Sequence, residues 1–335
     1  MMIVGLSVLT FIISLFGVFW VRQQAGTKLI DVPNERSSHT RPTPRGGGVG
    51  FVVAFALTSG LWFLLSRNHT VCSPVFWLIL LQLIGIGIWD DRFRVPVKTR
   101  YLVQLSVAIA LIIYFGVFPF PGLENIDGIW TIIPFVLTII GLTAMINFYN
   151  FMDGIDGLVA GVSAVQLGFL AVWFQQPEWW LLVAALLGFL YWNWSPAKIF
   201  MGDAGSTFLG CIVMTAFLAY NGDILQHWVA LVITFPLTID AIYTIIRRLI
   251  RYENIFKAHR THLYQRLHQA GWSHAQVTSA YVLLTLILGL LINWFSATGA
   301  LLGTLIVVAS IAIGELYLAF NWNRPKNLSE QRSDK

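Results

Sequence analysis

Residues 147–157 read Asn-Phe-Tyr-Asn-Phe-Met-Asp-Gly-Ile-Asp-Gly and interrupt an otherwise apolar region of the chain. An apolar run from 129 to 147 precedes them and another from 157 to 174 follows. Each run is close to the roughly 20 residues that an α-helix needs to cross a bilayer. Carboxylates at the border of hydrocarbon are costly unless they are paired, hydrated or bound to a cation, so acids in such a place are candidate functional residues. The pattern predicts two membrane-spanning helices with a functional connection between them.

The rest of the chain has the same apolar character. Of its 335 residues, 57% are hydrophobic and 11% are charged, whereas a soluble domain carries about 25% charged residues. Because only helices and closed barrels satisfy their backbone inside lipid, the repeated apolar runs predict an all-α polytopic integral membrane protein. The membrane is therefore an expected partner, and nucleic acid is not.

The apolar runs predict eleven membrane-spanning helices. They lie at 2–21, 47–66, 72–89, 101–118, 129–147, 157–174, 179–194, 205–220, 224–246, 276–295 and 298–320. No positive segment precedes the first run, so we expect an uncleaved span rather than a signal peptide. Cys72 and Cys211 fall in separate apolar runs and are expected to stay unpaired.

Lysine and arginine are distributed asymmetrically about these spans. If the N-terminus lies outside, 20 of the 21 lysines and arginines fall on the inner side, and only Arg67 falls outside. The positive-inside rule therefore predicts an outer N-terminus and a cytoplasmic C-terminus. We expect a single membrane-embedded domain over 1–322, whose five cytoplasmic connections form the site, and a polar cytoplasmic tail over 323–335.

The opening stretch lies on the inner side in this topology. Its four polar residues recur every three positions: Asn147, Asn150, Asp153 and Asp156. At about 100° per residue, an unbroken helix would turn Asn147 and Asp156 to opposite sides. One site can therefore use all four only if the helix breaks, and Gly154 and Gly157 offer places for a break. The alternative is that Asp153 or Asp156 caps the sixth span, which accounts for one acid but not for four polar residues in register.

Two further inner connections carry acids. Asp90 and Asp91 end the third span, where adjacent carboxylates need arginines, water or a divalent ion to offset their repulsion. A solvated helix end with local ion pairs is the alternative. Asp203 stands between Gly202 and Gly205, where a carboxylate is accessible to a cation.

Basic residues concentrate in the last and first inner connections. In the last, His259, Arg260 and His262 predict a cationic site for phosphate, because the two histidines share one helical face. No thiolate or third histidine lies nearby, which disfavours zinc, and an amphipathic helix on the membrane surface is the alternative. In the first, Arg41 and Arg45 are interpreted equally well as phosphate ligands or as contacts to anionic headgroups.

Four motifs in one order carry a resemblance to a known family. They are Asp90-Asp91, Asn147-Phe-Tyr-Asn150-Phe-Met-Asp153-Gly-Ile-Asp156-Gly-Leu, Phe200-Met-Gly-Asp203-Ala-Gly-Ser and His259-Arg-Thr-His262. The chain resembles the polyprenyl-phosphate N-acetylhexosamine-1-phosphate transferases of glycosyltransferase family 4, which include the MraY and WecA enzymes. The stretch 31–39 and the spaced histidines resemble the branch that starts O-antigen or related surface-polysaccharide synthesis. The peptidoglycan branch carries three successive histidines instead.

The resemblance implies an enzyme of the bacterial inner (cytoplasmic) membrane. Such an enzyme transfers N-acetylhexosamine-1-phosphate from a UDP-N-acetylhexosamine to polyprenyl phosphate, for example undecaprenyl phosphate, and releases UMP. Mg²⁺ is the implied cofactor, with Mn²⁺ as a substitute, and a homodimer is a further expectation. The identity of the sugar stays open, as does the choice between direct displacement and a covalent aspartyl intermediate.

The motif positions also imply roles for individual residues. Asp90 and Asp91 are the expected catalytic pair, and Asp203 is the expected magnesium ligand, with Asn150 as a second. The remaining expected contacts are Asn147, Asp153 and Asp156 to the nucleotide sugar, and His259, Arg260 and His262 to phosphate.

Two other classes of protein compete with this interpretation. An ion-coupled transporter would also carry membrane acids, and Asp240 and Glu315 fall inside predicted spans, but such a protein is expected to show internal symmetry that the chain lacks. A CDP-alcohol phosphotransferase would need an arginine directly after Ala160, where this chain has Gly161. We therefore expect the transferase.

Overall fold

The computed structural model describes residues 1–335 except for some short segments and the C-terminal end. The residues left out are 26–28, 34–37, 39–40, 67–71, 94, 124–127, 256, 258 and 323–335. The predicted tail, Arg67 and part of the stretch 31–39 therefore lie outside the described residues. Within the described part, helices account for nearly all regular structure, which confirms the all-α prediction.

The helices follow the predicted apolar runs closely. They are α1 (Met2–Ala25), α2 (Gly48–Leu65), α3 (Pro74–Phe93), α4 (Val97–Phe115), η1 (Gly128–Thr131), α5 (Ile132–Met152), α6 (Leu158–Trp173), α7 (Trp179–Asn193), α8 (Asp203–Leu218), α9 (Ile224–Leu231), η2 (Val232–Thr234), α10 (Phe235–Ile250), α11 (Leu263–Gln269) and α12 (His274–Trp322). The strands β1 (Ile30–Asp31) and β2 (Thr43–Pro44) pair antiparallel. Each predicted run is helical, although the run 224–246 is divided among α9, η2 and α10, and α11 is an additional short helix between α10 and α12.

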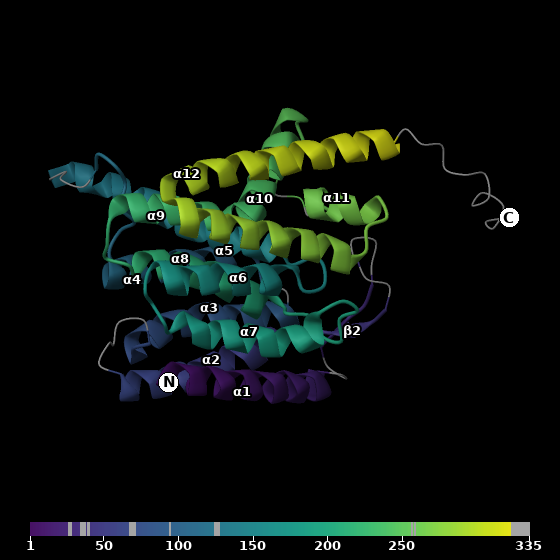
Figure 1. The fold of residues 1–335 in the computed structure, drawn as a ribbon. Helices are drawn as coiled ribbons and strands as arrows, with labels where there is room; N and C mark the ends of the chain where they lie inside the picture. Colours follow the sequence, from purple (N-terminus) through teal and green to yellow (C-terminus); the bar gives the residue numbers. More distant parts are fainter. Residues whose placement is uncertain are drawn as a thin grey trace.

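The last two predicted spans form the two arms of α12. The backbone at Ser296 leaves the helical region, with φ 46° and ψ −121°. Figure 1 shows the consequence, because one arm of α12 runs away from α11 and the other returns beside it. The turn that the gap between the runs 276–295 and 298–320 predicts is thereby confirmed.

Among the residues that the structure describes, seven helical segments are long and apolar enough to cross a membrane. Three further apolar helices, α6, α7 and α8, are shorter, and the seventh long segment is α12 with its two arms. The structure is thus that of a multi-pass membrane protein, whereas the count of eleven and the orientation stay predictions. The short helices lie among other helices, and nearly every residue of α8 is buried.

Close packing around α8 determines where the helix ends meet. A Cβ atom on Gly87 of α3 would lie 2.5 Å from Cα of Ala204, and one on Gly210 would lie 2.5 Å from the carbonyl oxygen of Met145 in α5. Glycine therefore allows α8 to approach both neighbours backbone to backbone. The ends of α3 and α5 and the start of α8 consequently lie side by side.

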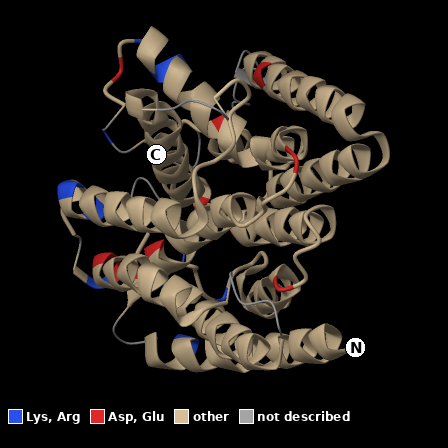
Figure 2. Ribbon diagram, turned by 90° about the vertical axis from the view of Figure 1, so that its left-hand side faces the viewer, with Lys and Arg blue, Asp and Glu red and all other residues tan. Residues whose placement is uncertain are grey.

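The connection between α1 and α2 is bound to the segment that precedes α8. The amide of Phe200 donates to the carbonyl of Pro44 (2.8 Å), Gly47 donates to Phe200 (2.9 Å), and Gly48 donates to Met201 (2.8 Å). In Figure 1 this strand region and α11 lie at the same end of the bundle. Figure 2, which views the molecule from the opposite end, shows helices with few acidic or basic residues along most of their length.

Candidate functional site

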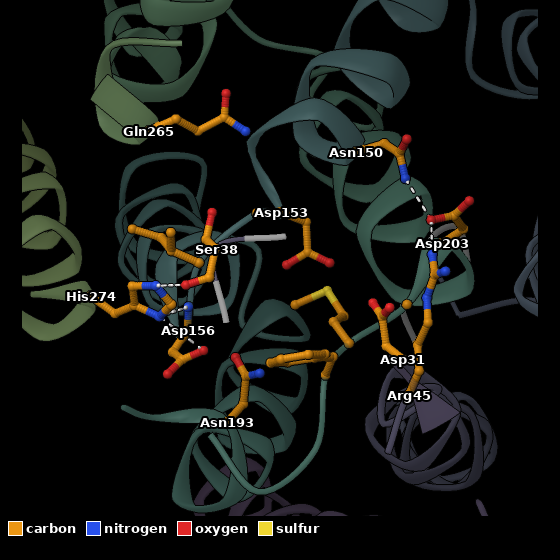
Figure 3. A pocket seen from close by; sticks show the side chains of 15 residues that line it. Asp31, Ser38, Arg45, Asn150, Asp153, Asp156, Asn193, Asp203, Gln265 and His274 are labelled. Atoms are coloured by element: carbon orange, nitrogen blue, oxygen red, sulfur yellow. Dashed lines mark hydrogen bonds and ion pairs between the residues drawn. The ribbon is translucent and has the colours of Figure 1, made fainter. Parts of the chain in front are cut away.

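A cavity of about 300 Å³ opens among the connections at this end. Its wall comes from segments far apart in the sequence, as Figure 3 shows. The lining residues are Asp31, Ser38, Arg45, Asn150, Asp153, Gly154, Ile155, Asp156, Asn193, Phe200, Met201, Gly202, Asp203, Gln265 and His274. Four of the ten predicted site residues lie on this wall: Asn150, Asp153, Asp156 and Asp203.

Asp91 holds the start of α8 in place. Its carboxylate accepts the backbone N–H of Asp203 at 2.9 Å and that of Ala204 at 3.5 Å. Because the first amides of a helix have no partner within it, a carboxylate there stabilises the helix end. A Cβ on Gly202 would lie 2.5 Å from Asp91 Oδ2, and Gly202 has φ +82°, so glycine is required on both counts.

Arg45 joins the acids of two connections. Its Nε lies 2.9 Å from Asp91 Oδ1, and its Nη2 lies 2.6 Å from Asp203 Oδ1. One planar guanidinium that contacts two carboxylates at once fixes their separation. The sequence did not decide whether Arg45 contacts phosphate or a lipid headgroup. The structure places Arg45 on the pocket wall, next to the acid cluster formed by Asp90, Asp91 and Asp203.

Asp90 differs from its neighbour in its contacts. Its Oδ2 lies 2.6 Å from Arg100 Nη1, and its Oδ1 accepts the N–H of Val95 at 2.6 Å. The same Arg100 nitrogen lies 3.5 Å from Asp203 Oδ2. The predicted pair therefore flanks Asp203 from two sides, with Asp91 held by backbone amides and Asp90 by an arginine.

The acid cluster fits a divalent cation in its chemistry. Two arginines, Arg45 and Arg100, face three carboxylates there, so negative charge is in excess. Asn150 Nδ2 donates to Asp203 Oδ1 at 3.1 Å and to Ser206 Oγ at 3.0 Å, which places an amide beside the carboxylate. Carboxylate and amide oxygens suit Mg²⁺. The described part contains no group of three His, Cys, Asp or Glu side chains arranged to hold a metal, so the carboxylates alone do not form a metal site here.

Asp153 points into the pocket in Figure 3. Burial raises the pKa of this carboxyl to about 7; the charge of Arg45 opposes the rise and that of Asp203 adds to it. Asp153 follows the last residue of α5, and α6 begins after Gly157, whose φ is +74°. The predicted helix break is confirmed, and the N-cap of α6 is Gly157 rather than either acid, so the capping alternative is wrong.

Asp156 contacts two other segments directly. Its Oδ1 lies 3.2 Å from Nδ1 of His274, and its Oδ2 accepts the N–H of Ala197 at 3.1 Å. Burial opposes ionisation of Asp156, but the contact with His274 and the Ala197 amide hold its pKa below the usual value. The other nitrogen of His274 lies 3.1 Å from the carbonyl oxygen of Ser38. His274 therefore links the connection between α1 and α2 to Asp156.

Asn147 lies away from the pocket. Its Nδ2 donates to Gln104 Oε1 in α4 at 2.8 Å and to the carbonyl of Thr143 at 2.7 Å. These contacts place it between α4 and α5, one helical turn before Asn150, and it does not line the cavity.

The basic motif lies beside the cavity rather than on its wall. The rings of His259 and His262 are 5.0 Å apart, and Gln265, one turn after His262, is the residue of this region that lines the pocket. Burial lowers the pKa of both histidines to about 4; the charge of Arg248 lowers both further, and His262 adds to the lowering at His259. Both are therefore neutral at pH 7, and the positive charge beside them belongs to arginines such as Arg248 and Arg260.

The two acids that favoured a transporter have partners within the chain. Asp240 accepts the amides of Leu263 and Tyr264 at the start of α11. Glu315 forms a two-pronged ion pair with Arg266. Both acids thus connect helices around α11, which removes the observation that favoured transport.

Sequence reasoning missed three site residues, Arg100, Gln265 and His274, and it named Arg45 without its carboxylate partners. Arg45 and Arg100 stand in basic connections, which was a usable signal. Their shared partner Asp203, however, lies 100 residues or more away in the sequence. Gln265 and His274 follow the histidine motif without any pattern of their own.

Comparison with known proteins places this geometry in a family. The model of glycosyl transferase family 4 matches residues 73–221. Over 289 residues the chain is 33% identical to the probable undecaprenyl-phosphate N-acetylglucosaminyl 1-phosphate transferase of Bacillus subtilis (strain 168), covering 80% of this chain and 78% of that protein. The chain belongs to glycosyl transferase family 4.

Other relatives of this glycosyl transferase family 4 member have similar names. The undecaprenyl-phosphate alpha-N-acetylglucosaminyl 1-phosphate transferase of Escherichia coli (strain K12) is 31% identical over 85% of this chain and 82% of its own. The decaprenyl-phosphate N-acetylglucosaminephosphotransferase of Mycobacterium leprae (strain TN) is 30% identical over 80% of this chain and 76% of its own. The predicted family is thereby confirmed.

Proposed function

We propose that this glycosyl transferase family 4 member transfers N-acetylhexosamine-1-phosphate from a UDP-sugar to a polyprenyl phosphate. An oxygen of the lipid phosphate attacks the sugar-bearing phosphorus of the donor, and the bond from that phosphorus to the bridging oxygen breaks. The products are the polyprenyl-pyrophosphate sugar and UMP. The relatives named above, matched over 76–82% of their length, are the observation that carries the proposal.

The geometry supports the same chemistry. One substrate is a lipid and the other a water-soluble nucleotide sugar, so the site must lie at the end of a membrane bundle. The acid cluster and the cavity of about 300 Å³ lie at such an end. We propose that this end faces the bacterial cytoplasm, since most of the lysines and arginines lie in the connections assigned to it.

We assign roles to the residues by their places in the cluster. Asp203 and Asn150 would hold Mg²⁺, which neutralises the charge that develops on the reacting phosphates. Asp90, held by Arg100, and Asp91, held by backbone amides, are the proposed catalytic pair and lie on either side of Asp203. Asp153 and Asp156 face the space that a nucleotide sugar would occupy. The histidine motif would meet phosphate as neutral hydrogen-bond donors beside Arg260.

The finer assignments follow from the relatives and from the branch of the family that the motifs resemble. N-acetylglucosamine is the sugar in the relatives' names, and we propose it first, ahead of its 6-deoxy analogues. The pathway would be O-antigen or related surface-polysaccharide synthesis.

The test is release of UMP by the purified protein in nanodiscs, with undecaprenyl phosphate and a panel of UDP-N-acetylhexosamines. We expect turnover with at least one donor, and its loss when Mg²⁺ is chelated. Asp203→Asn should reduce turnover at least 100-fold, whereas Asp223→Asn, an exposed acid before α9 that caps the amide of Leu225, should not. No UMP from any donor would overturn the proposal, and normal turnover by Asp203→Asn would overturn the metal assignment.

A further inference from the structure

Asp240 is a buried acid that the proposed chemistry does not use. It lies in α10 with 1% of its surface exposed, and it borders a largely apolar cavity with Pro236, Leu263 and Tyr281. A carboxylate in such surroundings is costly unless hydrogen bonds satisfy it. Its contacts should therefore show why an acid is kept there.

Four donors converge on the two oxygens of Asp240. Oδ1 accepts the N–H of Leu263 at 2.8 Å and the hydroxyl of Thr244 at 3.2 Å. Oδ2 accepts the hydroxyl of Tyr281 at 2.7 Å and the N–H of Tyr264 at 3.2 Å. One carboxylate thus joins α10 to both α11 and the first arm of α12.

The two amides belong to the first two residues of α11. Helix-starting amides have no partner within their own helix, and the amide before them, on His262, donates to Gln265 Oε1 at 3.3 Å. Asp240 and Gln265 therefore satisfy three successive amides. A helix of seven residues is too short to be stable alone, so α11 depends on such tertiary contacts.

The start of α11 in turn supports the connection that carries Asp153. The hydroxyl of Tyr264 donates to the carbonyl of Phe151 at 3.0 Å, and Tyr264 is fully buried. A Cβ on Gly154 would overlap this hydroxyl, so the tyrosine packs directly on the connection. Gln265, the next residue, lines the same cavity as Asp153 (Figure 3).

We propose that Asp240 is a positioning residue, which fixes the start of α11 and through it sets the places of His262, Gln265 and the Asp153 connection. Asp240 touches no substrate in this arrangement; it acts through the helix start that it holds. His262 is the N-cap residue of α11, and its Nδ1 lies 3.9 Å from Asp240 Oδ1, so it moves with that helix start. The positioning of α11 by Asp240 does not depend on the proposed function, whereas its effect on turnover rests on that function.

The first experiment measures positioning without any assay of turnover. Hydrogen–deuterium exchange of the peptide 259–269 is compared between the wild-type protein and Asp240→Asn in nanodiscs. We expect exchange at least tenfold faster in the variant, because the asparagine side chain would place its own N–H donors against the donors that the carboxylate accepts. Glu178→Gln is the matched control: Glu178 is a buried acid at the start of α7 whose loss should leave this peptide unchanged.

A second variant keeps the buried acid intact. Tyr264→Phe removes only the hydroxyl that donates to Phe151, and it should speed exchange in the peptide 150–157 at least threefold while 259–269 stays protected. Unchanged exchange of 259–269 in Asp240→Asn, or of 150–157 in Tyr264→Phe, would overturn the proposed positioning. If Asp240→Asn fails to fold, Tyr264→Phe still decides whether α11 supports the Asp153 connection.

The second experiment asks whether Asp240 acts through His262. Asp240→Asn is expected to lower kcat at least tenfold while changing the donor KM less than threefold. His262→Ala should then cost little more in the Asp240→Asn protein, because a mispositioned His262 has less to lose. If the two losses simply multiply, Asp240 does not act through His262, and that part of the proposal is wrong.

Failure of the two proposals can be told apart. A wild-type protein that releases no UMP from any donor contradicts the proposed function, and the exchange measurements still decide whether Asp240 fixes α11. Normal UMP release together with unchanged exchange in Asp240→Asn contradicts the positioning role alone.

Discussion

The guanidinium of Arg45 lies 2.6 Å from the carboxylate of Asp203, although 158 residues separate them in the chain. Arg45 follows a proline-rich segment, and Asp203 is the first residue of the buried helix α8. Their contact therefore joins two connections that lie far apart in the sequence. Because the same arginine also reaches Asp91, it determines how far apart the two acids stand.

Arg45 is therefore expected to be required for activity. Arg45→Ala should lower kcat/KM about 100-fold, equal to roughly 2.7 kcal/mol of transition-state stabilisation, because Asp91 and Asp203 lose their shared partner. Arg45→Lys should recover only part of this, since an ammonium cannot bridge two carboxylates in one plane. Arg41→Ala, an exposed neighbour in the same connection, is the control and should behave as wild type.

Gly202 is expected to tolerate no side chain. Gly202→Ala places a Cβ 2.5 Å from Asp91 Oδ2 at a φ of +82°, which costs about 1–3 kcal/mol for the backbone alone. Both the thermal midpoint and UMP release should fall. Gly85→Ala, in α3 with no atom within 4 Å of the added Cβ, should lower neither, and equal behaviour of the two variants would contradict the close contact at Gly202.

Asn147 is expected to act on stability rather than on substrate binding. Asn147→Leu leaves Gln104 without its partner, at a cost of about 1–3 kcal/mol. The thermal midpoint should drop while the donor KM changes less than twofold. A tenfold rise in KM with an unchanged midpoint would restore the nucleotide-sugar contact that the sequence predicted.

The histidine motif predicts a dependence of stability on pH. Burial lowers the pKa of His262 to about 4 from the ordinary 6.5, so between these values the unfolded chain binds more protons than the folded one. The neutral histidine contributes its full stability above pH 6.5 and loses it progressively as the pH falls toward 4. The thermal midpoint should therefore drop from pH 7 to pH 5 more steeply for wild type than for His262→Gln. Parallel curves would show that His262 does not titrate in this window.

Much of the fold was predictable because the membrane imposes a simple rule on the sequence. Long apolar runs must be helices, and the alternation of their ends brings 90–91, 150–156 and 203 to one side of the bundle. Even the reversal at Ser296 follows from two apolar runs with a short gap between them.

The contacts within the site were less predictable, because they depend on which helices become neighbours. Every third residue of the opening stretch is polar, yet Asn147 faces Gln104 of α4 whereas Asn150 faces Asp203 of α8. The role of Asp240 depends on a seven-residue helix that carries no apolar run of its own. Nor does the number of histidines show that burial keeps two of them neutral.

The backbone bonds between residues 44–48 and 200–201 have a consequence for how the protein is made. A ribosome that adds about 5–20 residues per second reaches Asp203 roughly 8–30 s after Arg45. During that interval the amides of Gly47 and Gly48, and the contact of Arg45 with Asp203, await partners that have not been synthesised. A nascent chain that stops before α8 has no acid cluster, so chain termination in the first half yields membrane helices without a site rather than a weakly active enzyme.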